Sequence, residues 1–218
     1  MAPVARHALS AGLASLLTRA TGLIREVVFA AVFGATLQAD AFHAAFRVPN
    51  LFRDLFAEGS MANAFVPTFA DAAEKQGLQS AWALANALLG ALAVVLGVLT
   101  LVMVVFADGF TWLVAAGFAE VPGKAELTAT VVRLVSPFLA MVSVASLAGG
   151  MLNVRGRFFL PALAPATFNL AVVAGCVVPA SWQQAVGLEP VLTVALAASV
   201  GGALQVLVQL PALWAEGF

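Results

Sequence analysis

The sequence predicts an all-α integral membrane protein, a bundle of six transmembrane helices. The 218 residues are 62% hydrophobic and only 10% charged, whereas soluble domains carry about 25% charged residues. The mean hydropathy of +1.02 exceeds what a soluble chain of this length can hide in a core. Several uncharged stretches also reach the roughly 20 apolar residues that a helix needs to cross a bilayer. A soluble globular protein is therefore excluded as the expected class.

The first two helices are predicted over residues 8–33 and 40–72. The N-terminus faintly resembles a signal peptide, but Arg19 interrupts its apolar run early, so we interpret it as a retained helix. The segment FGATLQAD at residues 33–40 supplies a glycine-containing turn. Pro49 is expected to kink or break the second helix, because proline removes one backbone hydrogen bond.

The other four helices are predicted from apolar stretches that short polar segments separate. Glycine and proline mark these separators as loops. The expected spans are residues 82–107, 128–152, 160–180 and 189–214. The tryptophans stand at span ends, where indole rings favour the membrane interface: Trp82, Trp112, Trp182 and Trp214.

The distribution of charge between the loops predicts a cytoplasmic N-terminus. Lysine and arginine are enriched in cytoplasmic loops of membrane proteins. With six alternating spans, Lys75 and the pair Arg155 and Arg157 fall on the same side as Arg6. The opposite loops carry mostly acidic residues: Asp108, Glu120, Lys124, Glu126 and Glu189.

Charges are concentrated in the first two helices, although a charge at the bilayer centre costs about 2.5–3.5 kcal/mol. These residues are Arg19, Arg25, Glu26, Asp40, Arg47, Arg53, Asp54 and Glu58. On a regular helix with about 100° per residue, one polar stripe is formed by Asp40, Arg47, Asp54 and Glu58. Arg53 points away from that stripe.

Arg19 and Arg25 lie within the first predicted span, and no nearby acid is expected to neutralise both. Unpaired arginine in a membrane implies a hydrated cavity, and the planar guanidinium suits phosphate groups. Structural roles stay open for the acidic residues: an ion pair for Glu26 and Asp54, a helix cap for Asp40 and simple solvation for Glu58. The charges alone therefore predict a cationic cavity, lined by the first two helices, in a transporter of an anionic substrate.

No pattern in the sequence favours an enzyme. His7 and His43 stand apart from any nucleophile, and no cluster of histidine, cysteine and acidic residues has metal-ligand spacing. No glycine-rich loop follows a strand, and no basic tail points to nucleic acid. Cys176 is the one cysteine, which excludes an internal disulfide. We expect no catalytic residue, no metal and no cofactor.

The stretch TRATGLIREVVFAAVFGATLQADAFHAAFRVPNLFRDLFAEGSMANAFVPTFAD, residues 18–71, carries a series of short motifs. They are TR at 18–19, Gly22, RE at 25–26, FGA at 33–35, DAF at 40–42, Arg47, PN at 49–50, Arg53, FAEG at 56–59 and AFVP at 64–67. Their spacing closely resembles the start of the MurJ (MviN) family, lipid II flippases of the multidrug/oligosaccharidyl-lipid/polysaccharide exporter superfamily. SPFLAMVSVASLAGGMLNVRGRFFLPALAPATFNL and GGALQVLVQLPAL resemble its later helices. Two residues depart from the family pattern, Thr36 in place of a glycine and Asp54 in place of a basic residue.

The resemblance implies translocation of lipid II, the undecaprenyl-diphosphate-linked disaccharide-pentapeptide, to the outer leaflet of the bacterial cytoplasmic (inner) membrane. No covalent chemistry is implied. Two lobes of about fourteen helices in all would rock around a central cavity. Residues 1–218 match the N-terminal lobe, so we expect a fragment, a truncated chain or a split protein that needs a missing C-terminal lobe. The alternatives are export of another polyprenyl-linked glycan or a drug, and a membrane scaffold that transports nothing.

The resemblance also implies roles for individual residues. The substrate-binding residues would be Arg19, Arg25, Asp40, Arg47, Asn50, Arg53 and Glu58. Among them, the arginines at 19, 25 and 53 would contact the diphosphate or sugar. The structural or hinge residues would be Gly22, Gly34, Pro49, Gly59 and Pro67. The expected partners are lipid II, membrane lipids and the missing lobe, and nucleic acid is not expected.

Overall fold

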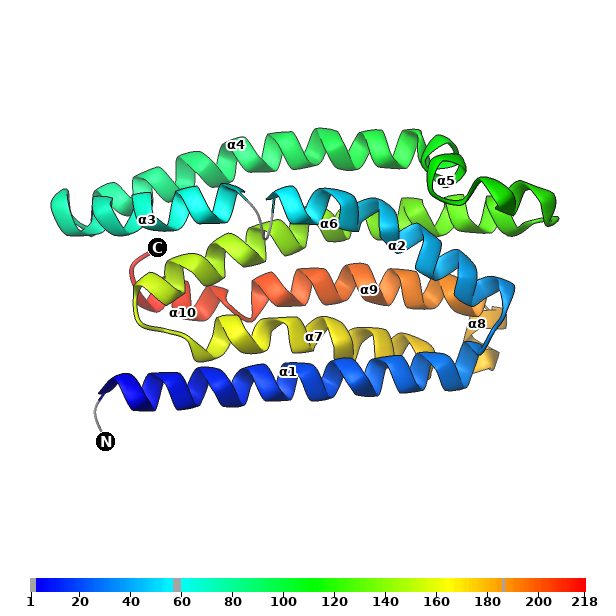
Figure 1. Ribbon diagram of the computed structural model, residues 1–218, viewed down its shortest axis with the longest axis horizontal. Coiled ribbons are helices and arrows are strands. Elements are labelled where there is room, and N and C mark those ends of the chain that lie inside the picture. Colours follow the sequence, from blue (N-terminus) through cyan, green and yellow to red (C-terminus); the bar gives the residue numbers. More distant parts are fainter. Residues whose placement is uncertain (1–2, 57–59, 186) are drawn as a thin grey trace.

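The computed structural model describes residues 3–56, 60–185 and 187–218, and all regular elements in these ranges are helical (Figure 1). The α-helices are α1 (Pro3–Phe33), α2 (Leu37–Phe56), α3 (Ser60–Lys75), α4 (Leu78–Val105), α5 (Ala107–Ala115), α6 (Lys124–Val154), α7 (Phe159–Cys176), α8 (Ala180–Ala185), α9 (Pro190–Leu207) and α10 (Leu210–Ala215). A 3₁₀ helix, η1 (Ala116–Glu120), follows α5. The predicted all-α class is confirmed.

The expected number of six helices is wrong for the described residues. The predicted second helix corresponds to two described helices, α2 and α3, with residues 57–59 outside the description. The sixth divides into α9 and α10, and α5, η1 and α8 are short additional helices. Pro49 does not break the second helix, since α2 runs through it to Phe56. Pro211 stands in the first turn of α10, where its missing N–H interrupts the helical ladder that continues from α9.

Helix α6 is the centre of the packing. It contacts α2, α3, α4 and α5 on one side and α9 on the other, and α9 in turn packs on α7. Helix α1 packs against α7 at the edge of this array. The turn at Gly34 joins α1 to α2, yet the two helices lie on different parts of the bundle, α1 over α7 and α2 over α6 (Figure 1). Side chains from both helices line the cavity described below.

The loops gather at two ends of the bundle. The N-terminus, the α3–α4 turn, the α6–α7 loop and the C-terminus lie at one end (Figure 1). This end carries Lys75, Arg155 and Arg157, as the sequence predicts for one membrane side. The α1–α2 turn, the segment between α4 and α6 and the segment between α7 and α9 lie at the other end.

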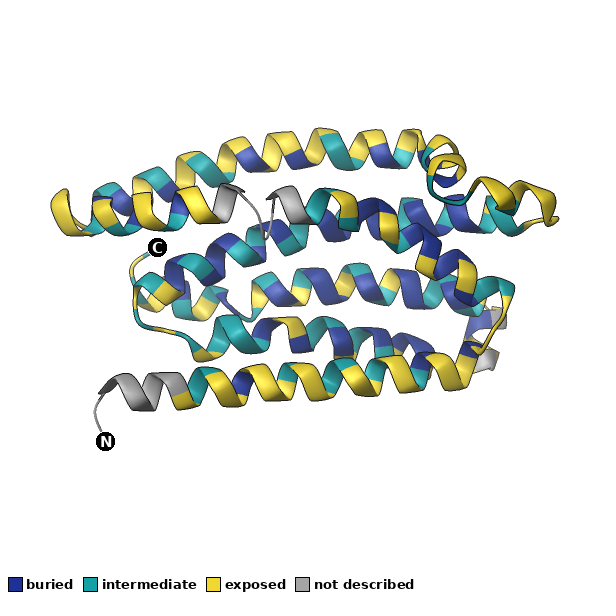
Figure 2. Cartoon of the chain, in the orientation of Figure 1, coloured by how far each residue is buried: buried dark blue, intermediate teal, exposed yellow. Residues whose placement is uncertain are grey.

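In the described part of the chain, four helical segments are long and apolar enough to span a membrane: Leu78–Val105, Lys124–Val154, Phe159–Cys176 and Pro190–Ala215. Of these, α4 has 17% of its most apolar window buried, whereas α6 has 56%. Figure 2 shows the exposed residues along α1 and α4 at the two edges of the bundle. Many of them are large and apolar, such as Leu16, Leu23, Val94 and Leu101. Such surfaces suit lipid or a partner rather than water. The spans expected at 8–33 and 40–72 stay predictions.

The helices α7 and α9 approach each other closely at glycines. A Cβ atom at Gly201 would lie 2.8 Å from Cα of Phe168, and one at Gly175 would lie 2.7 Å from Cβ of Ala197. Real Cβ atoms essentially never come so near. Small residues at such crossings are typical of helix packing in membranes. The close contact at Gly201 thus fixes the position of Phe168 on α7 relative to α9.

Three of the four tryptophans are exposed, and their place at a membrane interface stays a prediction. Trp112, Trp182 and Trp214 are 69%, 72% and 63% exposed in the short helices α5, α8 and α10. Trp82 differs, because its ring packs 5.0 Å from Phe69 and 5.4 Å from Phe218, measured between centroids. It contributes to the core rather than to an aromatic belt.

Candidate functional site

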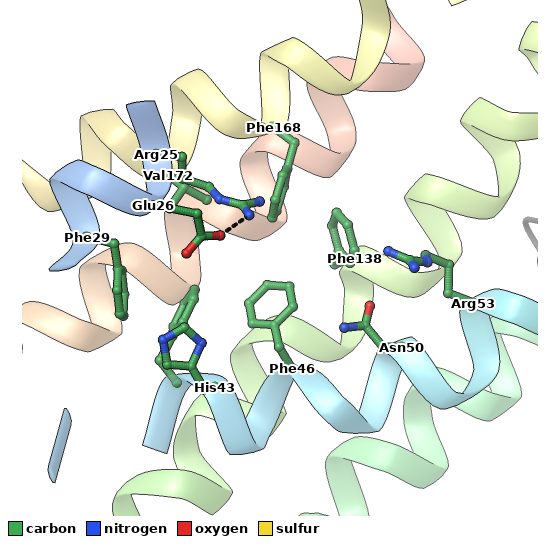
Figure 3. A pocket seen from close by; sticks show the side chains of 11 residues that line it. Arg25, Glu26, Phe29, His43, Phe46, Asn50, Arg53, Phe138, Phe168 and Val172 are labelled. Carbon is green, nitrogen blue, oxygen red and sulfur yellow. Dashed lines mark hydrogen bonds and ion pairs between the residues drawn. The ribbon is translucent and has the colours of Figure 1, made fainter. Parts of the chain in front are cut away.

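A cavity of about 260 Å³ lies between α1, α2, α6 and α7 (Figure 3). It is lined by Arg25, Glu26, Phe29, Phe42, His43, Phe46, Asn50, Arg53, Phe138, Phe168 and Val172. Aromatic rings form most of the described wall, and its charged residues are Arg25, Arg53 and Glu26. We call it the cationic cavity.

Arg25 reaches the cationic cavity from α1 and is held on three sides. Its Nη1 donates a 3.1 Å hydrogen bond to Oδ1 of Asn169. Its Nη2 forms an ion pair with the carboxylate of Glu26. The guanidinium carbon lies 5.4 Å from the ring centroid of Phe168, within the range of a cation–π interaction. The side chain is 28% exposed, so it is positioned but still accessible.

The ion pair agrees with the structural role that the sequence leaves open for Glu26. Glu26 pairs with Arg25, which is consistent with the expectation that no nearby acid neutralises both Arg19 and Arg25. The carboxylate is 56% exposed, so solvent screens the pair and its net contribution to stability is small. An anion that enters the cavity therefore meets Arg25 in a solvated pair, from which Glu26 can be displaced.

Arg53 and Asn50 approach the same cavity from α2. In Figure 3, Arg53 stands across the cavity from Arg25, with Phe138 and Phe46 between them, and Asn50 lies beside Arg53. The ring of Phe46 contacts those of Phe138 and Phe168 at 5.7 and 6.1 Å between centroids. Arg25 and Arg53, which are 28 residues apart in the sequence, thus face the same cavity from two different helices. On a regular helix, Arg53 points away from the polar stripe of the second helix. In the structure, Arg53 lines the cationic cavity.

Asn169 is a site residue that the sequence analysis misses. It lies on α7, is 6% exposed, and its Nδ2 donates to the carbonyl of Thr18 and to Oγ1 of Thr21, each at 3.2 Å. The amide is therefore fixed from α1 while its oxygen holds Arg25. The available signal is a lone amide in an otherwise apolar span, since polar groups within membrane helices usually have a function.

Three predicted substrate-binding residues lie outside the cationic cavity. Arg19 is exposed and stands on a different face of α1, beside Leu16 in a shallow apolar groove. Asp40 accepts a 2.6 Å hydrogen bond from Nζ of Lys124 at the start of α6. Arg47 is exposed on α2. Their roles stay predictions.

The remaining predicted residues either shape helices and turns or fall outside the described residues. Glu58 and Gly59 fall outside the described residues. Gly34 has φ +53°, a left-handed conformation that favours glycine at the end of α1. A Cβ at Gly22 would make ordinary contact with Asn169, 3.5 Å from Nδ2. The two predicted prolines, Pro49 and Pro67, lie inside α2 and α3.

Thr36, the departure from the family pattern at the α1–α2 turn, caps a helix. Its Oγ1 accepts a 3.4 Å hydrogen bond from the backbone N–H of Ala39. Threonine is a favoured residue at this position, because the first N–H groups of a helix have no partner within it. The turn therefore keeps its function without the glycine.

The arrangement is suited to holding an anion without reacting with it. Two guanidiniums can donate several hydrogen bonds to oxyanions, and the aromatic wall lowers the local dielectric around them. Within the described ranges, no group of three or more histidine, cysteine or acidic residues could hold a metal ion.

Comparisons with known proteins place these features in one family. The family model described as "Lipid II flippase MurJ" matches residues 29–218. The lipid II flippase MurJ of Burkholderia cenocepacia is 41% identical over 199 residues, which are 91% of this chain and 38% of that protein. A probable lipid II flippase MurJ of Rhizobium meliloti is 38% identical over 204 residues, which are 93% of this chain and 37% of that protein. This chain therefore spans less than half the length of these relatives.

A solved structure has the same fold. The chain titled "Lipid II flippase MurJ, inward closed conformation" superposes with a TM-score of 0.74 over 93% of this chain and 41% of that chain. The sequence identity is 23%, so this likeness concerns the helical arrangement alone. It agrees with the bundle derived above.

Proposed function

Because this chain belongs to the lipid II flippase MurJ family, we propose that it forms the N-terminal lobe of a flippase for lipid II. The complete protein would carry the diphosphate-linked head group from the inner to the outer leaflet of the bacterial cytoplasmic membrane. The substrate is moved and not altered, so the lobe needs groups that bind and release an anion. A second lobe would close the cavity that this one leaves open, as in other two-lobed transporters.

The observation that carries the proposal is the convergence of Arg25 and Arg53 on one cavity (Figure 3). A diphosphate has oxygens on two adjacent phosphorus atoms, and two arginines on opposite walls can each pair with one phosphate. The aromatic lining strengthens such contacts, because charges interact more strongly away from water. Asn169 holds Arg25 in place for this contact.

Release follows from the same geometry. Glu26 already pairs with Arg25 in the described structure, so it competes with the incoming diphosphate for the guanidinium. When the lobes change position and Arg53 moves relative to Arg25, the diphosphate loses one of its two partners. Glu26 then completes the coordination of Arg25 again. Such a site binds the anion tightly in the lobe arrangement where both arginines contact it, and weakly in the arrangement where only one does.

Orientation is part of the proposal. The end that holds the chain termini carries Lys75, Arg155 and Arg157. Basic residues near short loops favour the cytoplasmic side. We place this end in the cytoplasm, so that the Asp40–Lys124 ion pair lies at the outer side. Cysteine labelling of Gln76 and Gly187 variants from the two sides of the membrane tests this placement.

The experiment compares Arg25→Ala and Arg53→Ala in the full-length protein. Both variants are expected to abolish translocation of lipid II while the protein remains in the membrane at normal levels. Lysine at either position restores activity only in part, since it lacks the bidentate fork. Lys75→Ala, at an exposed ion pair with Asp71, is the control and retains activity. Normal translocation by both alanine variants rejects the proposal.

Arg19→Ala separates the roles of the arginines on α1. Arg19 does not line the cationic cavity. Affinity for undecaprenyl diphosphate is therefore expected to fall in Arg25→Ala and to stay unchanged in Arg19→Ala, even if both variants lose transport. Equal losses of affinity would place Arg19 in the diphosphate site.

A further inference from the structure

A second cavity, of about 680 Å³, lies between α3, α6 and α7 and is closed by the end of α9. Among the described residues that line it, none carries a charge, in contrast to the cationic cavity. Its polar lining residues are Asn63, Ser146, Asn153, Gln205 and Gln209. Alanine, glycine, proline and valine supply most of the rest. We call it the neutral cavity.

Gln205 presents its amide to the neutral cavity. The residue is 4% exposed, and its side chain makes no hydrogen bond to any described residue. Its amide is not among the fully enclosed polar atoms that lack a partner, so it borders the open space of the cavity, where a ligand can hydrogen-bond to it. A primary amide offers both a donor and an acceptor. A bound group with the same two functions would satisfy Gln205.

Gln209 connects two helices that line the neutral cavity, α6 and α9. Its Nε2 donates to the carbonyls of Ala145 and Gln205, at 3.0 and 2.8 Å, which ties the end of α9 to α6. Its Oε1 is buried and has no hydrogen-bond partner among the described residues. A Cβ at Gly149 would lie 3.3 Å from that oxygen, a tight contact, so α6 and Gln209 pack closely at this glycine. The amide of Gln205 is therefore displayed from a rigid wall.

Two prolines add backbone acceptors on facing walls. Pro67 in α3 and Pro165 in α7 both line the neutral cavity, and each lacks the N–H that would bond to the carbonyl four residues earlier. Those carbonyls belong to Asn63 and Pro161, which also line the cavity. A ligand that donates hydrogen bonds through hydroxyl or amide groups can reach these acceptors.

The neutral and cationic cavities adjoin. On α6, Phe138 lines the cationic cavity and Val142 the neutral one. On α7, Phe168 and Pro165 stand in the same relation. The pairs are four and three residues apart, about one helical turn, or roughly 4.5–6 Å of rise. One molecule can therefore place an anion beside Arg25 and an attached neutral group in the neutral cavity.

We propose that the neutral cavity binds the saccharide attached to the diphosphate, an inference that rests on the function proposed above. Sugar hydroxyls donate to the freed carbonyls, and Gln205 pairs with a hydroxyl or an amide substituent. Glycine and alanine in the wall leave room for the sugar ring. The described lining offers no charge to pair with the charged peptide, and burying an unpaired charge is costly. A volume of about 680 Å³ falls in the usual range for small-molecule sites, about 300–1,000 Å³.

The test measures binding to the full-length protein in nanodiscs with three ligands. They are undecaprenyl diphosphate, the same lipid with the disaccharide, and the same lipid with the disaccharide and pentapeptide. Gln205→Leu removes the amide and keeps the bulk. Gln183→Leu is the matched control, since Gln183 is also buried at 7% exposure and lines neither cavity.

Gln205→Leu is expected to weaken binding of both saccharide-bearing lipids by about fivefold to tenfold, the usual effect of losing a hydrogen bond or two. Its affinity for undecaprenyl diphosphate stays at the wild-type value, and Gln183→Leu binds all three ligands normally. Equal affinities of Gln205→Leu and wild type for every ligand would overturn the proposal. So would a loss confined to the peptide-bearing lipid, which would assign the cavity to the peptide.

The same measurements distinguish this proposal from the proposed function. Arg25→Ala weakens all three ligands if the cationic cavity binds the diphosphate. When Arg25→Ala shows that loss and Gln205→Leu shows none, only the saccharide assignment is rejected. When the wild-type protein binds none of the ligands, the proposed function itself is rejected, and the saccharide site is rejected with it.

Discussion

Oδ1 of Asn169 on α7 accepts a 3.1 Å hydrogen bond from Nη1 of Arg25 on α1, across 144 positions of sequence. The same amide donates to Thr18 and Thr21 on α1. Arg25 is thus oriented by a helix other than its own. Its place in the cationic cavity depends on the packing of α1 against α7.

Asn169→Leu is expected to weaken binding of undecaprenyl diphosphate by about tenfold, because a hydrogen bond to a charged group contributes about 1.5–3 kcal/mol. Asn169→Asp keeps an acceptor for Arg25 but adds a negative charge that repels the diphosphate, so it binds at least as poorly. Isothermal titration with the full-length protein measures both. If Asn169 only fills space, Asn169→Asp lowers the unfolding midpoint and leaves affinity unchanged.

Gly201→Ala is expected to destabilise the lobe by about 1–3 kcal/mol, the usual cost of overpacking. The new Cβ would stand 2.8 Å from Cα of Phe168 and 2.9 Å from Cβ of Ala171, so α7 must move away from α9. Gly90→Ala is the control, because nothing lies within 4 Å of a Cβ there and alanine favours a helix by up to about 1 kcal/mol. Thermal unfolding in detergent compares the two, and equal midpoints would contradict the close contact.

The pair formed by Asp40 and Lys124 predicts rescue by charge reversal. Lys124 is 13% exposed and Asp40 56% exposed, so Asp40→Lys sets a second cation beside a largely buried one and impairs transport. The double variant Asp40→Lys with Lys124→Asp restores the attraction and recovers most activity. A transport assay in cells that depend on the full-length protein reports this. Failure of the double variant, with normal protein levels, would indicate that Asp40 contacts the substrate instead.

Glu216 predicts a dependence of stability on pH. Hydrogen bonds from Arg157 and Arg155 lower the pKa of the Glu216 carboxyl from its ordinary value of 4.5, and both bonds measure 2.9 Å. A carboxyl with a lowered pKa stabilises the fold above the unfolded-state pKa, and that stabilisation is lost as pH falls through the folded-state pKa. The wild type should therefore lose stability below pH 4.5, as its ionised form disappears.

Glu216→Gln is the variant that isolates this effect. Its unfolding midpoint at neutral pH is lower than that of the wild type, and the difference narrows as the pH drops below the ordinary value of 4.5. Glu189→Gln, at an exposed residue, keeps the wild-type pH profile. A constant gap between Glu216→Gln and the wild type at all pH values would show that ionisation of Glu216 plays no part.

Local sequence accounts for much of the fold. Apolar stretches without charge predict the helical membrane class, and α4, α6, α7 and the α9–α10 segment follow those stretches closely. The glycine at position 34 predicts the turn between α1 and α2. The passage of α2 through Pro49 is not predictable in this way. A proline costs one backbone hydrogen bond, and packing of α2 on α6 can outweigh that loss.

For the candidate site too, the sequence predicts some of the residues and not others. The motifs of residues 18–71 are enough to identify the family, which the match over residues 29–218 confirms. They also direct attention to Arg25, Asn50 and Arg53, which share the cationic cavity. They do not reveal Asn169, because its neighbours are apolar and its partners lie on another helix.

The sequence by itself determined that this chain is an apolar helical protein of a flippase family with charges in its first helices, because hydropathy and motif spacing are local properties. Only the tertiary structure decided which charges meet. Arg25 and Arg53 face one cavity while Arg19 faces another side of α1. The reason is that the rotation of each helix about its axis is set by its contacts. Gly201 against Phe168 and Asn169 against Thr18 are two such contacts, and both join residues far apart in the chain.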